Sequence, residues 1–145
     1  MKDVAMLLHE AAALMRRRFE QTARPEGLTL MQWRALGLLS VEGPIRQVTM
    51  GEALEASPMT ISDLAERLTA CGLATRRTDP RDSRAKVLEL TEEGHRKLAV
   101  MKSKSEQVFD EIFTGVTEAE RTALISGLGK LKTNLGMAET VSAHG

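Results

Sequence analysis

The sequence contains almost none of the residues from which disulfide frameworks and zinc sites are built. Its 145 residues include one cysteine, Cys71, and three histidines. A single cysteine cannot form an intramolecular disulfide, and the chain has no CxxC pair or Cys/His spacing of the kind that binds zinc. We therefore expect a fold that holds without disulfides, and we expect no metal ion or other cofactor.

Aromatic residues and long apolar runs are also scarce. The chain has three Phe, one Trp and no Tyr, so we do not expect the stacking platforms that bind single-stranded nucleic acid. No run of eighteen apolar residues occurs, and the basic cluster near the N-terminus follows the apolar stretch, which is the reverse of a secretion signal. The composition predicts a cytoplasmic protein without a membrane segment, and a nucleic-acid partner would be duplex.

The chain lacks an excess of charge of either sign. Twenty basic and twenty acidic residues give a formal net charge of zero. Coating nucleic acid regardless of its sequence requires many phosphate contacts, so this balance argues against it but is compatible with one basic surface. With 42% hydrophobic residues, the chain is long enough for one domain with a core.

Patterns typical of catalysis are absent from the sequence. We find no nucleophile and base at a suggestive spacing, no carboxylate pair and no glycine-rich phosphate loop. The sequence therefore predicts no catalytic residue, and we do not expect an enzyme.

The clearest helix signal begins at Ser57, a good N-cap residue, followed by Pro58, which suits the first helical position. Gly72 suits the left-handed residue that follows a helix. Between them, apolar residues recur at helical spacing: Ile61, Leu64, Ala65 and Leu68. The pattern predicts an amphipathic helix with one face in the core and one face outside.

The residues before this helix predict a helix-turn-helix. A capping box at 49–52 is expected to open a short helix, and residues 55–57 to form the turn into the next one. Another capping box at 29–32 is expected to open a helix that ends at Gly43 and Pro44, with Trp33 as a core anchor. Residues 45–48 are expected to be extended and to add a strand to a sheet.

The residues after Gly72 predict a hairpin with a basic tip. Short β-leaning runs at 73–78 and 86–90 flank the turn-forming residues 79–83. Two acidic residues, Asp79 and Asp82, are outnumbered in this region by five cations: Arg76, Arg77, Arg81, Arg84 and Lys86. The positive charge of a neutral chain is thus concentrated here.

The two ends of the chain predict amphipathic helices. An apolar stripe with heptad-like spacing runs over residues 4–19, before an expected loop at 21–28. Thr91 suits the N-cap of a long polar helix, and a capping box at 117–120 opens a last helix with a leucine seam (Leu124, Leu128, Leu131 and Leu135). Residues 136–145 are expected to be a frayed end.

These apolar stripes predict a symmetric homodimer, because each needs an apolar partner to bury against. We expect the interface to include Leu7 and Leu8 of the first helix and Leu124, Leu128 and Leu131 of the last helix.

Three segments carry a resemblance to a known family: LTLMQWRALGLL at 28–39, AERLTACGLATRR at 65–77, and DPRDSRAKVLELTEEG at 79–94. With them, the chain resembles the multiple-antibiotic-resistance regulator (MarR) family of bacterial winged-helix transcription factors. The resemblance implies a mainly α fold with a small β-hairpin, in which residues 29–94 form a winged helix-turn-helix. Residues 1–22 and 95–136 would be the dimerisation helices of a single domain, 1–145.

The resemblance also implies a function. The protein would be a dimeric, sequence-specific DNA-binding transcriptional regulator, more often a repressor in this family, with a pseudo-palindromic operator. A small aromatic or phenolic effector would release it, binding near His9 and Trp33. Arg84 would reach the minor groove from the hairpin, with Asp82 bracing the turn. The residues that this implies for DNA contact are Thr49, Pro58, Met59, Thr60, Ser62, Asp63, Arg67, Arg77, Arg81, Arg84 and Lys86.

Some alternatives stay open at the level of sequence. Asp63 stands where many family members have a basic residue; it could accept a hydrogen bond from cytosine N4, or pair with Arg67 four residues later, which we favour. Cys71 is interpreted as a small buried hydrophobic residue, with a thiol-based redox switch as the alternative. The winged helix could also serve as a protein-interaction module.

Overall fold

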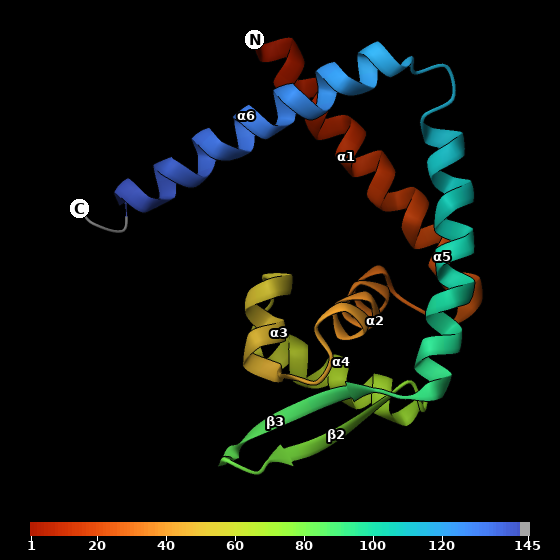
Figure 1. The fold of residues 1–145 in the computed structure, drawn as a ribbon, viewed down its shortest axis with the longest axis vertical. Coiled ribbons are helices and arrows are strands. Elements are labelled where there is room, and N and C mark those ends of the chain that lie inside the picture. The colour runs from red at the N-terminus through yellow and green to blue at the C-terminus, as the bar shows by residue number, and fades with distance from the viewer. Residues whose placement is uncertain (143–145) are drawn as a thin grey trace. The chain divides into compact units, whose positions relative to one another are not determined.

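The computed structural model describes the backbone of residues 1–142 and the side chains of residues 1–137 (Figure 1). Residues 1–109 form one compact unit, and the chain from Asp110 onward forms another. The elements, in order, are α1 (Lys2–Ala23), the 3₁₀ helix η1 (Arg24–Glu26), α2 (Leu30–Glu42), β1 (Ile45–Arg46), α3 (Gln47–Leu54), α4 (Pro58–Ala70), β2 (Ala74–Asp79), β3 (Asp82–Leu90), α5 (Glu92–Ile112) and α6 (Glu118–Ser142). The expected mainly α fold with a small hairpin is confirmed.

Side-chain caps fix where several helices begin. Thr29 and Gln32 form a reciprocal capping box at the start of α2. The hydroxyl of Ser57 accepts a hydrogen bond from the Thr60 N–H at the start of α4, whose first residue is Pro58. Thr117 caps α6 in the same way, and its N–H donates to Glu120. These predicted helix starts are confirmed.

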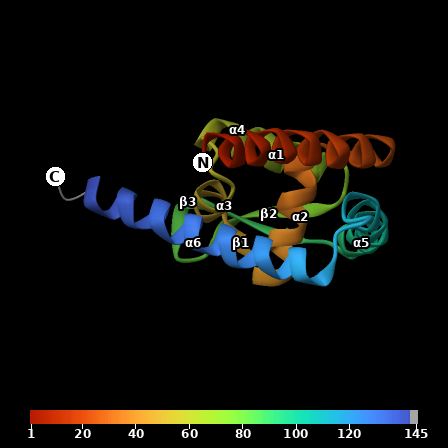
Figure 2. The same cartoon turned by 90° about the horizontal axis from the view of Figure 1, so that it is seen from above.

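Several predicted boundaries are wrong, and the end expected to be frayed at 136–145 is helical as far as Ser142, with residues 143–145 outside the described part of the chain. The loop expected at 21–28 is shorter, because α1 continues to Ala23, which is fully buried; Figure 2 shows α1 as one continuous helix. Pro25 lies after the end of α1, within the separate turn η1. The capping box at 49–52 does not form either: α3 begins at Gln47, directly after the two residues of β1, so Thr49 lies inside its first turn.

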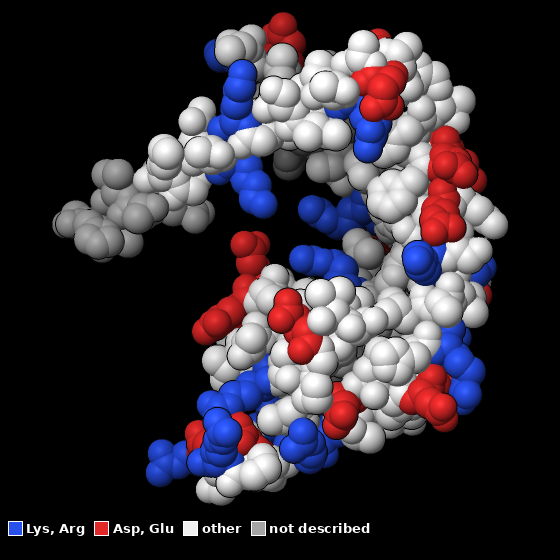
Figure 3. Space-filling view, in the orientation of Figure 1, with Lys and Arg blue, Asp and Glu red and all other residues white. Residues whose placement is uncertain are grey.

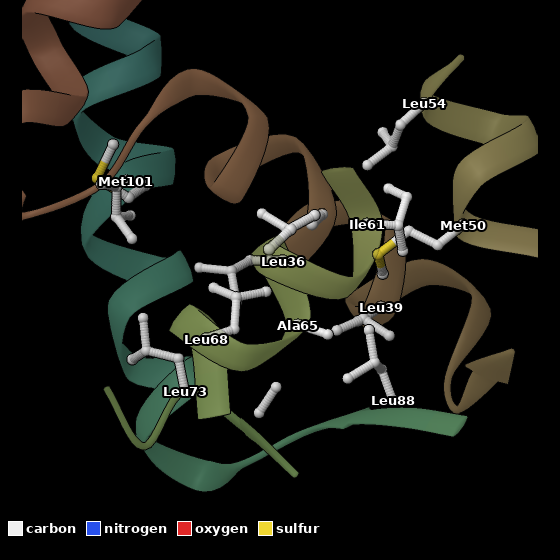
Figure 4. Close-up of a cluster of buried hydrophobic side chains, with 14 of the residues drawn as sticks. Leu36, Leu39, Met50, Leu54, Ile61, Ala65, Leu68, Leu73, Leu88 and Met101 are labelled. Atoms are coloured by element: carbon white, nitrogen blue, oxygen red, sulfur yellow. The ribbon is translucent and has the colours of Figure 1, made fainter. Parts of the chain in front are cut away.

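The core of residues 1–109 lies between α2, α3, α4 and the inner face of the sheet. Ile61, Ala65 and Leu68 of α4 project into it together with Leu36 and Leu39 of α2, Met50 of α3 and Leu88 of β3 (Figure 4). Met101 of α5 is also fully buried. The predicted apolar stripe of α4 is therefore its buried face.

The three strands form one antiparallel sheet in the order β1-β3-β2. Ile45 pairs with Leu88, and Ala74 pairs with Leu90. The turn is narrower than the expected 79–83, because Asp79 already pairs with Asp82 and leaves only Pro80 and Arg81 between the strands. The short segment at Ile45 does add a strand, as the sequence predicted. We refer to β2, β3 and their turn as the wing.

The end of α4, the base of the wing and the start of α5 meet at one junction. Gly72 has φ of 73°, the left-handed conformation predicted for it, and Leu73 N–H donates back to the Leu68 carbonyl. The Thr91 hydroxyl donates to the Gly72 carbonyl at 2.7 Å and accepts from the Gly94 N–H at 3.0 Å. One side chain thus joins all three elements and forms the predicted cap of α5.

Lysines of α5 bind the turn that follows α1. The carboxylate of Glu26 lies 3.3 Å from Lys97 Nζ and 3.2 Å from Lys104 Nζ. Their hydrogen bonds, that of Lys104 first, hold the pKa of Glu26 below its usual value. Higher along the same helix, Phe109 makes an edge contact with Phe19, which in turn makes one with Trp33. Residues 97–109 of α5 are therefore fixed to α1 and to the turn that follows it.

Two helices carry apolar faces that are exposed. On α1 these residues include Leu7, which is 65% exposed, and Leu8. On α6 they are Leu124, Leu128, Leu131 and Leu135, each at least 42% exposed. The helical spacing that predicted these stripes is present, and neither stripe is buried.

Gly94 should be intolerant of any side chain. A Cβ at this position would overlap the Leu73 carbonyl oxygen and the Leu90 side chain. We expect Gly94→Ala to lower the free energy of unfolding by about 1–3 kcal/mol, the usual cost of overpacking. The control is Gly37→Ala within α2, where an added Cβ meets nothing within 4 Å; it should raise stability by about 0.5–1 kcal/mol. Urea unfolding of both variants tests this, and equal midpoints would contradict the tight junction.

Candidate nucleic-acid interface

The exposed face of α4 begins at its N-terminus. Met59 is 77% exposed, and Thr60 and Asp63 are also exposed. The Thr60 hydroxyl lies 2.9 Å from the Ser57 hydroxyl, so the cap and the first turn share one hydrogen-bonded pair. The N-terminal end of α4 therefore presents polar and apolar side chains to solvent, while the opposite face of the helix is buried in the core.

The tip of the wing is organised by two aspartates. Asp79 accepts a hydrogen bond from the Arg81 N–H at 2.8 Å, and Asp82 accepts one from the Arg84 N–H at 3.0 Å. Such side-chain to backbone bonds stabilise tight turns. The Lys and Arg side chains that gather over the tip are visible in Figure 3. The two acids therefore shape a turn whose projecting side chains are mostly cations.

An ion pair ties the wing to the start of α3. Arg46 Nε of β1 lies 2.7 Å from Asp79 Oδ2, and the Asp79 side chain is only 11% exposed. The hydrogen bond from the Arg81 N–H, and after it the bond from Arg46, hold the pKa of Asp79 below its usual value. Sequence analysis missed this pair, because 33 residues separate its partners and the register of β1 was needed to bring them together.

A groove of about 540 Å³ lies between the wing and the helix-turn-helix. Arg84 and Lys86 line it from β3, and Pro58 and Ile61 line it from α4. The Lys86 ammonium also donates to the Thr78 hydroxyl at 2.9 Å. The structure thus brings Arg84, Lys86 and the N-terminus of α4 to one surface, although 26 residues separate Pro58 from Arg84.

A second hollow, of about 230 Å³, lies where α4 meets the start of α2. Thr60, Asp63 and Arg67 line it from α4, and Thr29 lines it from the cap of α2. Within the described part of the chain, no hydrogen bond or ion pair joins Asp63 to Arg67. The favoured pairing is therefore wrong: four residues along a helix bring two side chains within reach, but an exposed pair gains too little to hold them together.

The two neighbouring arginines of β2 are on opposite faces of the sheet. Arg76 pairs with Leu88, whose side chain is in the core, and its Nη2 lies 3.5 Å from Ser62 Oγ of α4. Arg77 is on the other face, 3.9 Å from Glu89. Arg76 was not among the residues expected to contact DNA. Its pairing with the buried Leu88 places it on the face of the sheet that packs against α4, and this was the signal that could have identified it.

The remaining candidates are scattered. Thr49 is exposed on α3, His9 is exposed on α1, and Trp33 is half-buried against the core. Cys71 is exposed, so its interpretation as a buried residue is wrong. The reason is its place at the C-cap of α4, where the chain reverses at Gly72 and Leu73 takes the buried position instead.

Comparisons with known proteins agree on one family. The sequence profile of the MarR family matches residues 26–85. The HTH-type transcriptional repressor NicR of Pseudomonas putida is 31% identical over 90% of this chain and 82% of its own length. The chain belongs to the MarR family. The transcriptional regulator HosA of Escherichia coli is 30% identical, over 88% of this chain and 98% of its own.

Solved structures of the MarR family have the same fold. Bordetella bronchiseptica BpsR, whose DNA binding is regulated by 6-hydroxynicotinic acid, is 30% identical with a TM-score of 0.78 over 90% of this chain and 98% of its own. A mutant of Escherichia coli MarR bound to operator DNA has a TM-score of 0.79 at 20% identity, over 89% and 93% of the two chains. This MarR-family protein is a DNA-binding transcriptional regulator.

The described residues of this MarR-family protein lack two further kinds of feature. In that part of the chain, no group of three His, Cys, Asp or Glu side chains is arranged to hold a metal ion. No helix within residues 1–142 is both long enough and apolar enough to cross a bilayer.

The ion pair between Arg46 and Asp79, near the tip of the wing, predicts how the Asp79 carboxylate titrates. Because the pKa of Asp79 lies below its usual 3.8, the carboxylate stabilises the folded wing above that pH, and this contribution is lost as the pH falls through the lower, folded value. In carboxyl ¹³C NMR, Arg46→Gln should raise the Asp79 midpoint only part of the way to 3.8, since the Arg81 N–H remains. Arg96→Gln, which removes a partner of Glu93 instead, should leave it unchanged; an equal shift in both variants would contradict the pair.

Proposed function

We propose that this regulator is a homodimeric repressor that binds a pseudo-palindromic operator and is released by a small aromatic acid. In this proposal, the start of α4 enters the major groove and the wing tip reaches the adjacent minor groove. The protein acts in the cytoplasm and has no enzymatic activity. The observation that carries the proposal is the shared surface of Arg84, Lys86 and the N-terminus of α4.

The electrostatics of that surface support duplex binding. A formally neutral chain gathers cations on the wing, while Asp79 and Asp82 are occupied with the turn. A narrow A·T-rich minor groove concentrates negative potential and attracts an arginine such as Arg84. Pro58, Met59, Thr60 and Ser62 are assigned to the major groove, and Thr49, Arg67 and Lys86 to the backbone. Arg77 is assigned a weaker role, since it lies on the other face of the sheet.

The effector is proposed from the relatives and from one cluster of rings. NicR is a repressor, and the DNA binding of BpsR is regulated by 6-hydroxynicotinic acid. In this chain, Trp33 makes an edge contact with Phe19, and aromatic side chains of this kind line many ligand sites. The effector site is assigned to the region of Trp33 and of α1, which carries His9. Effector binding releases DNA only by favouring a conformer of the dimer in which the two α4 helices and wings no longer fit the operator.

Arg84→Ala should weaken operator binding, because it removes the cation assigned to the minor groove. We expect a loss on the order of tenfold, about 1.4 kcal/mol, concentrated on operators with A·T-rich flanks. Arg96→Ala removes the same charge from α5 and should change affinity little. Titration of labelled duplexes at fixed salt measures both. Equal affinity of Arg84→Ala and the parent protein would exclude the wing assignment, and binding that hardly depends on salt would favour a protein-interaction module instead.

Leu128→Asp should abolish the dimer, because it places a charge in the middle of the exposed leucine face of α6. We expect monomers or aggregates by light scattering, and loss of tight operator binding. Asn134→Asp adds the same charge elsewhere on α6 and should leave the dimer intact. A well-behaved Leu128→Asp dimer would show that Leu7, Leu8, Leu124, Leu128 and Leu131 do not form the interface.

A further inference from the structure

The core packing of α4 determines which of its residues can face DNA. Ile61, Leu64, Ala65 and Leu68 are buried. At 3.6 residues per turn, the opposite face of the helix is centred on Met59, Asp63 and Glu66. Asp63 lies in the second turn after Pro58, within the part of α4 that the proposed complex places in the major groove. A carboxylate therefore stands at the middle of the reading face.

The carboxylate of Asp63 is exposed and is not engaged by its neighbours. Within the described residues it accepts no hydrogen bond and forms no ion pair, although Arg67 lines the same hollow. The nearby Ser62 hydroxyl is contacted by Arg76, not by Asp63. A charged acceptor in this position is repelled by every phosphate of the duplex, whatever the base sequence. It is compatible with tight binding only where the DNA offers it a donor.

We propose that Asp63 is a specificity-determining residue, whose carboxylate accepts a hydrogen bond from the N4 amino group of one cytosine in each half-site. The inference rests on the proposed DNA-binding function and specifies one base that the protein recognises. In the major groove, guanine presents only acceptors and thymine an acceptor and a methyl group, so both repel a carboxylate or leave it unsatisfied. Adenine presents its amino group beside the N7 acceptor, which would face the second carboxylate oxygen. Cytosine presents its amino donor alone.

The test is a selection of bound duplexes from a random pool with the full chain and with two variants, Asp63→Asn and Asp63→Ala. The parent protein should select cytosine at one position per half-site, by about 5- to 150-fold over other bases, which corresponds to about 1–3 kcal/mol. Asp63→Asn should move this preference to adenine, because an amide both donates and accepts and matches adenine N7 and N6. Asp63→Ala should lose the preference at that position and keep the others.

The matched control is Glu66→Gln, which removes the same charge from the same face of α4, three residues further along. It should strengthen binding to all duplexes alike and leave the selected bases unchanged. Thermal unfolding confirms that each variant is folded, and the exposed Asp63 should tolerate both changes.

The remaining outcomes separate this inference from the function on which it rests. If Asp63→Asn and Asp63→Ala select the same bases as the parent protein and merely bind every duplex more tightly, Asp63 only repels phosphate and the inference is overturned, while the proposed function stands. If the parent protein enriches no motif and its binding is insensitive to salt, the proposed function fails and the inference fails with it.

Discussion

The burial of one side of α4 is the constraint on which the rest of the structure depends. Four apolar side chains of this helix fill the space between α2, α3 and β3, so α4 can neither rotate nor slide without opening the core (Figure 4). The helix is only 13 residues long, and it begins at a serine cap and a proline. The packing of α4 therefore determines which of its residues face solvent, independently of any binding partner.

The wing obeys a different kind of constraint, which is electrostatic and local. Its tip has few apolar contacts, and its shape comes from aspartates that accept backbone hydrogen bonds and from the ion pair between Arg46 and Asp79. Two of the wing's acidic residues, Asp79 and Asp82, are thereby used in the turn, and its cations remain exposed. A chain with no net charge can in this way present a positively charged surface, because the aspartates bond the backbone of the turn while the basic side chains stay in solvent.

Much of the fold follows from short-range patterns in the sequence. The caps at Thr29, Ser57 and Thr117, the left-handed Gly72 and the stripe from Ile61 to Leu68 each depend on residues a few positions apart, and the structure contains all of them. The failures arose where a distant contact decided the outcome. Strand pairing at Arg46 started α3 before Thr49, and the reversal at Gly72 brought Leu73 inward in place of Cys71.

The candidate site divides along the same line. The cations between Arg76 and Lys86 indicated a basic wing, but only the register with β3 distinguishes Arg76, beside Ser62, from Arg77 on the outer face. Helical spacing allowed Asp63 to reach Arg67, and geometry alone could not say whether the exposed pair would form. An exposed side chain has several possible contacts of nearly equal free energy, so spacing in the sequence does not predict which of them forms.

The hydroxyl of Thr91 has a mechanical consequence. It donates to the carbonyl of Gly72, just past the end of α4, and accepts from the N–H of Gly94 in the first turn of α5, where the absence of a Cβ lets that turn approach the Leu73 carbonyl. We therefore expect the first turn of α5 and the end of α4 to move together. A shift at the start of α5 would therefore pass to the end of α4 through this junction, while Lys97 and Lys104 hold the following turns of α5 to Glu26.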